Sequence, residues 1–118
     1  MWRDTSQGVQ RALNNGVDVN AKNNSGWTPL DFACRYQTNP EITKLLLDKN
    51  ADVNTKTNDG WTPLHLACRY QTNTEIAKVL LDNRVDANAK NNNGKTPSDI
   101  VTDIGNHDMA ELLVRYSW

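Results

Sequence analysis

Residues 26–39 read Gly26-Trp27-Thr28-Pro29-Leu30-Asp31-Phe32-Ala33-Cys34-Arg35-Tyr36-Gln37-Thr38-Asn39, and the pattern returns thirty-four residues later as Gly60-Trp61-Thr62-Pro63-Leu64-His65-Leu66-Ala67-Cys68-Arg69-Tyr70-Gln71-Thr72-Asn73. A weaker copy follows as Gly94-Lys95-Thr96-Pro97-Ser98-Asp99-Ile100. A period of this length indicates a solenoid, in which each repeat buries its apolar face against its neighbours. Such an array offers an elongated surface rather than a closed pocket, so the repeat favours binding over catalysis.

Each repeat contains the signals for a turn followed by a helix. The turn glycines, Gly26, Gly60 and Gly94, suit a backbone with positive φ. The threonine before each proline can cap the free N–H groups of a helix, and proline fits the first helical position because no donor is needed there. We therefore predict first helices near residues 29–36, 63–70 and 97–104.

A second helix is predicted in each repeat, near residues 40–49, 74–83 and 107–115. Apolar residues recur there at helical spacing, as in Ile42, Leu45 and Leu46. An Asp-x-Asn turn follows at residues 52–54 and 86–88 and leads into the next repeat. The expected fold is an all-α solenoid of helix-turn-helix units joined by β-hairpin-like turns.

The charge and hydropathy of the chain exclude several classes of partner. Thirteen basic residues balance fourteen acidic ones, so the net charge of −1 provides no field to gather nucleic acid or an anionic membrane. The longest apolar run, at residues 45–47, is too short to span a bilayer, and the N-terminus has no apolar signal segment. We expect an intracellular protein, cytoplasmic or nuclear.

Cys34 and Cys68 occupy the same position one repeat apart. Packed helices lie about 8–10 Å apart, whereas a disulfide needs Cα atoms within about 6.8 Å. We therefore expect two buried free thiols. Neither cysteine has a second Cys or His at ligand spacing, so no metal and no cofactor are predicted.

The sequence Gly-Trp-Thr-Pro-Leu-His-Leu-Ala at residues 60–67, with a Val-Leu-Leu run and Asp-x-Asn turns, resembles the ankyrin repeat and its Thr-Pro-Leu-His-x-Ala signature. The resemblance covers nearly the whole chain as one domain, residues 1–118. It implies a partial N-terminal repeat at 1–20, repeats at 21–54 and 55–88, and a C-terminal capping repeat at 89–118. It also implies a protein or peptide partner.

The chain departs from the family pattern in three ways. The Tyr-Gln-Thr-Asn segment adds a residue to the usual period of about 33, except in the third repeat. Arg84 stands where the family usually has a glycine ending the second helix, which predicts a strained left-handed residue. The partial repeat lacks a first helix, so either the chain belongs to a longer array or Trp2 covers the apolar end.

Ankyrin proteins commonly bind partners on a concave face made by hairpin tips and first helices, and the resemblance places several large or charged residues there. Trp27 and Trp61 stand out because no core packing is demanded after the turn glycine. The alternative is that each indole ring lies across the next hairpin as local packing. Lys22, Lys56 and Lys90 form a basic stripe that suggests an acidic partner. The predicted partner-binding residues are Trp27, Arg35, Tyr36, Lys56, Asn58, Asp59, Trp61, Arg69, Tyr70 and Lys95.

No catalytic residues are predicted. His65 stands where the family uses the imidazole to bond the turn backbone near Thr62, and His107 has no nucleophile at a recognisable spacing. The main prediction is a non-catalytic protein–protein interaction module, with a monomer favoured. Two alternatives remain open: an aromatic cage including Trp27 and Trp61 that recognises a modified side chain or small ligand, and a structural spacer or engineered scaffold.

Overall fold

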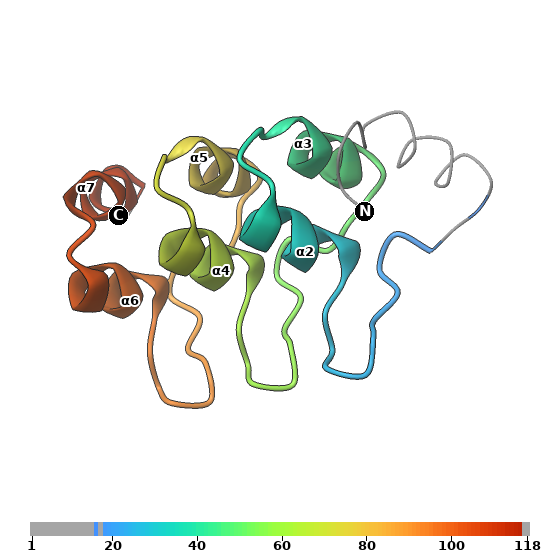
Figure 1. Ribbon diagram of the computed structural model, residues 1–118, viewed down its shortest axis with the longest axis horizontal. Coiled ribbons are helices and arrows are strands. Elements are labelled where there is room, and N and C mark those ends of the chain that lie inside the picture. Colours follow the sequence, from blue (N-terminus) through green and yellow to red (C-terminus); the bar gives the residue numbers. More distant parts are fainter. Residues whose placement is uncertain (1–15, 17, 117–118) are drawn as a thin grey trace.

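The computed structural model describes residue 16 and residues 18–116 as a stack of helix pairs (Figure 1). The first helices of the three repeats pack side by side, the second helices cover one side, and the long turns project from the other. No strand occurs among these residues, which confirms the all-α prediction. The helices are α2 (Pro29–Tyr36), α3 (Glu41–Asp48), α4 (Pro63–Tyr70), α5 (Glu75–Asp82), α6 (Pro97–Ile104) and α7 (His107–Arg115).

The first helices begin where the Thr-Pro signals predict. Thr28 caps α2: its hydroxyl accepts a hydrogen bond from the Asp31 N–H, and its own N–H donates to Asp31 Oδ2 at 2.8 Å. The same reciprocal pattern, with proline next to the cap, starts α4 and α6. Because every partner is three residues away, local sequence alone specifies this start.

The turns between repeats are held by a left-handed glycine and by bonds to the next turn. Gly60 has a φ of +81°, and a Cβ there would lie 2.8 Å from the Asn92 backbone nitrogen. Asn58 ties the first two turns together, because its N–H donates to Ser25 O and its side-chain amide donates to Asn24 O. The turns therefore stack as a row, with glycine required where they approach each other.

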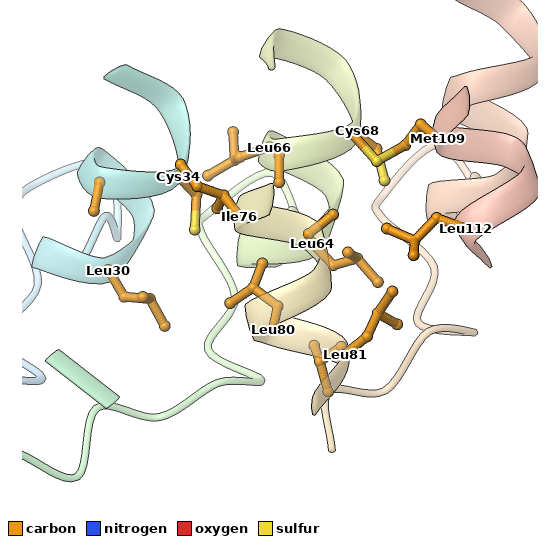
Figure 2. Close-up of a cluster of buried hydrophobic side chains, with 14 of the residues drawn as sticks. Leu30, Cys34, Leu64, Leu66, Cys68, Ile76, Leu80, Leu81, Met109 and Leu112 are labelled. Carbon is orange, nitrogen blue, oxygen red and sulfur yellow. The ribbon is translucent and has the colours of Figure 1, made fainter. Parts of the chain in front are cut away.

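The apolar core is one stripe that runs along the stack. Figure 2 shows its central part, where leucines of α4 and α5 meet Cys34 on one side and Met109 and Leu112 on the other. Cys34 and Cys68 are free and fully buried, as predicted. Burial raises the pKa of the Cys68 thiol to about 12 and that of Cys34 also upward, so both side chains behave as small apolar groups.

A glutamine in the turn after α4 links the first two repeats. Gln71 follows α4 and is 5 % exposed. Its Nε2 donates to Cys34 O at 2.7 Å and to Gln37 O at 2.8 Å, at the C-terminal end of α2. Two helix-end carbonyls that the helix cannot satisfy internally are thereby bonded. The third repeat has Gly105 at the position of Gln71, so it offers no side-chain amide to the end of α4.

The residue two positions beyond α3 and beyond α5 adopts the predicted left-handed conformation. Asn50 has a φ of +72° and Arg84 a φ of +65°. Gly16, which holds the same place before the first full repeat, has a φ of +87°. Arg84 therefore carries a side chain in a conformation that favours glycine. The rest of the predicted partial repeat, and the suggested cover by Trp2, fall outside the described residues.

Candidate protein-binding surface

Three of the exposed large apolar side chains occupy equivalent positions in the three repeats. Tyr36, Tyr70 and Ile104 end α2, α4 and α6 and are 56 %, 41 % and 40 % exposed. Among the described residues the other exposed side chain of this kind is Val114 in α7. We call Tyr36, Tyr70 and Ile104 the apolar row. Ile104 was not among the predicted residues, although its spacing of thirty-four from Tyr70 is visible in the sequence.

The predicted arginines are interleaved with the tyrosines. The guanidinium carbon of Arg35 lies 3.7 Å from the ring centre of Tyr70 and 4.6 Å from that of Tyr36. Arg69 lies 5.1 Å from the ring centre of Tyr70. These distances suit cation–π contacts, and one of them joins the first repeat to the second. Four of the predicted residues therefore form a single stack, the Arg–Tyr stack.

Trp27 and Trp61 are less exposed than the sequence indicated. Trp27 and Trp61 are half-buried and pack against the core, so the expectation that no packing is demanded at this position is wrong. The Trp27 ring lies 5.1 Å from the Phe32 ring, and the Trp61 ring lies 5.5 Å from the His65 ring. The chain turns back at the glycine, so each indole contacts the helix of its own repeat.

Most of the predicted polar residues of the turns form a hydrogen bond or an ion pair within the protein. Lys22 Nζ donates to Lys56 O at 3.1 Å, and Lys56 Nζ donates to Lys90 O at 3.5 Å, so the basic stripe crosses the repeats. Lys95 pairs with Asp103 at 3.2 Å. Asn58 holds two turns together, whereas the Asp59 side chain is exposed at the turn tip.

His65 is a bonded core residue. It is fully buried, its Nδ1 lies 3.1 Å from the Thr62 nitrogen, and its Nε2 lies 2.8 Å from Lys95 O. The imidazole thus accepts from its own helix start and donates to the next repeat, and burial lowers its pKa. This arrangement confirms the prediction of a hydrogen-bonding role near Thr62.

Asp31 and Asp99 hold the His65 position in the other repeats, with different surroundings. Asp31 is fully buried, and its Oδ1 has no hydrogen-bond partner among the described residues. Burial raises the pKa of Asp31 to about 6. Asp99 is exposed, and hydrogen bonds from Thr96 lower the pKa of its carboxyl group. The pKa values of these two equivalent carboxyl groups are therefore shifted in opposite directions.

Two hollows lined by described residues lie away from the Arg–Tyr stack. One of about 450 Å³ lies between the turn after α4 and α7, where Asp108 and Glu111 line it with polar residues. The other, of about 350 Å³, lies beside Trp27, Pro29 and Phe32. In the described part of the chain no three His, Cys, Asp or Glu side chains gather to hold a metal ion.

Comparison with known families agrees with the observed fold. A family model described as ankyrin repeats (3 copies) matches residues 39–117, which is more than half of the chain. A second model, ankyrin repeats (many copies), matches residues 6–47. The chain belongs to the ankyrin-repeat family. Ankyrin repeats are generally protein–protein interaction modules and are generally not enzymes.

A comparison of this ankyrin-repeat protein with curated proteins gave no match. None of the helices described here is long and apolar enough to cross a membrane. The family relationship therefore supplies the general role of the chain, whereas its own exposed side chains determine the surface and the partner.

Proposed function

We propose that this ankyrin-repeat protein binds a peptide or protein segment across its first helices and turns. The observation that carries the proposal is the apolar row formed by Tyr36, Tyr70 and Ile104. Single exposed apolar residues are ordinary on protein surfaces, but a row with one member per repeat presents a continuous strip. Packing of the repeats does not require large apolar groups at these exposed positions, so a partner is the better explanation for them.

The Arg–Tyr stack supports the same surface. Tyrosine and arginine are enriched among the residues that dominate binding energy at interfaces. Stacking of Arg35 between Tyr36 and Tyr70 limits the rotamers of all three side chains before a partner arrives. Less conformational entropy is then lost on binding. Trp27, Lys56, Asn58, Asp59, Trp61 and Lys95 complete the proposed surface around the stack.

The proposal is tested with a variant that changes exposed residues only. Tyr36→Ala/Tyr70→Ala removes two members of the apolar row, and Lys44→Ala/Lys78→Ala is the matched control because it changes equivalent exposed positions of α3 and α5. Partners captured from lysate should be retained by the wild type and the control and lost from the tyrosine variant. Circular dichroism and melting would establish that all three proteins are folded.

The captured partner then locates the surface directly. Its binding should slow hydrogen exchange at the C-terminal ends of α2 and α4 and leave α3 and α5 unprotected. If the tyrosine variant retains every partner while the lysine control loses them, the partner binds the second helices and the proposal fails.

A further inference from the structure

We infer that the segment bound across the first two repeats is acidic, with aspartate or glutamate carboxylates that meet Arg35 and Arg69. The inference rests on the proposed function and adds the chemistry of the partner. Its starting point is that both guanidinium groups lie over the Tyr70 ring, and that neither takes part in the ion pairs of the described residues. Within the described residues, no carboxylate of the protein forms an ion pair with Arg35 or Arg69.

The described ion pairs lie elsewhere. They join Lys95 to Asp103 in the third repeat and Glu111 to Arg115 within α7. A guanidinium that stacks through its face keeps its N–H donors at the edge, where they match the two oxygens of a carboxylate. Arg35 and Arg69 are thus held in place by stacking and still able to form bidentate, charge-assisted hydrogen bonds.

The turn lysines add positive charge to the turns that precede α2 and α4. Lys22 and Lys56 each use Nζ to bond a carbonyl of the following turn, which fixes the two ammonium groups along the array. An ammonium has three donors, so each retains capacity for a carboxylate. The exposed acidic side chains between α3 and α4 are Asp59 at the turn tip and Asp52 nearer α3. Basic groups therefore outnumber acidic ones along the first two repeats of this surface.

The third repeat has an acidic residue where the first two repeats have arginine, so the two ends of the surface differ in charge. Asp103 stands where the first two repeats have Arg35 and Arg69, and it is paired with Lys95. Ile104 stands where they have tyrosine. An acidic stretch therefore fits over the first two repeats and an apolar residue over the third. This charge complementarity distinguishes an acidic segment from a neutral or basic one.

The repeat spacing sets the spacing of the acids. Neighbouring helices pack about 8–10 Å apart, and an extended peptide advances about 3.3 Å per residue. Two carboxylates that reach Arg35 and Arg69 should therefore lie two or three residues apart in the partner.

A peptide library tests the inference without knowledge of the natural partner. Random 12-residue peptides displayed on phage would be selected against the folded wild-type chain, and enriched peptides would be synthesised with a fluorescent label for anisotropy titrations. The test variant is Arg35→Gln/Arg69→Gln. The control is Lys44→Gln/Lys78→Gln, which removes the same charge from equivalent exposed positions of the second helices.

Enriched peptides are expected to contain two acidic residues separated by two or three positions. The arginine variant should weaken their binding about tenfold or more, which is the order of a lost charge-assisted hydrogen bond. The lysine control should keep the wild-type affinity, and added salt should weaken binding because the contacts are exposed.

Three results would overturn the inference: enrichment of neutral or basic peptides, enrichment of no peptide, or unchanged affinity of acidic peptides for the arginine variant. Amide chemical shifts separate this failure from that of the proposed function. Neutral peptides that shift the amides of Arg35, Tyr36, Arg69 and Tyr70 would overturn only the acidic chemistry. Peptides that shift only α3 and α5 would overturn both.

Discussion

Replacement of the buried carboxylate of Asp31 by an amide, Asp31→Asn, should change how stability depends on pH. Burial raises the pKa of Asp31 from 3.8 to about 6, against the opposing hydrogen bonds from Thr28. Between these pH values the folded chain keeps a proton that the unfolded chain has released. Folding therefore takes up a proton, and the free energy of unfolding contributed by this group falls as pH rises.

The size of the effect follows from the two pKa values. The difference between 3.8 and about 6 corresponds to about 3 kcal/mol, because each pKa unit is worth about 1.4 kcal/mol. The cost of holding an ionised Asp31 in the folded chain is absent below pH 3.8 and complete above about pH 6. In Asp31→Asn the amide oxygen can still accept a hydrogen bond from the Thr28 N–H, but the side chain no longer titrates. The stability of the variant relative to wild type should therefore rise by up to about 3 kcal/mol between pH 4 and pH 7.

Urea denaturation followed by tryptophan fluorescence, repeated from pH 4 to pH 7.5, would measure this difference. Asp99→Asn is the matched control from the third repeat. Hydrogen bonds from Thr96 lower the pKa of Asp99, so its contribution is present above the unfolded pKa and is lost as pH falls. The stability of Asp99→Asn relative to wild type should fall as pH rises, opposite to Asp31→Asn.

The pH dependence of the difference is the test, because any constant cost of the amide cancels from it. A difference between Asp31→Asn and wild type that stays flat from pH 4 to pH 7 would refute the argument. It would mean that the carboxylate is solvated in the folded state.

Three further substitutions test the links between repeats and the strained position after α5. Gln71→Ala should lower the free energy of unfolding by about 2–3 kcal/mol, because two carbonyls at the end of α2 lose their donor; an equal loss in the exposed neighbour Thr72→Ala would contradict this. Arg84→Gly should stabilise by up to about 1 kcal/mol through relief of left-handed strain, and an unchanged or lower Tm would count against it. Gly60→Ala should destabilise by about 1–2 kcal/mol or more, since φ is positive and a Cβ would clash with Asn92; wild-type stability in urea would show that the turns can separate.

The sequence by itself determined the features whose causes lie within a few residues. Thr28 and Asp31 are three positions apart, so the start of α2 could be predicted, and the same holds for α4 and α6. The left-handed backbone at Gly26 and Arg84 followed from the position of each residue relative to its helix. The period of thirty-four then assigned the same local structure to each repeat.

Only the tertiary structure decided the features that join residues of different repeats. The contact of Arg35 with Tyr70 and the bonds of Gln71 to the end of α2 depend on how closely two helices pack. Asp31 is buried and Asp99 is exposed, although both follow a Thr-Pro signal at the same spacing, so the sequence alone did not distinguish them. Burial also corrected the expectation that Trp27 needs no packing. Exposure and pKa are properties of the packed array, because they depend on atoms that a single repeat does not contain.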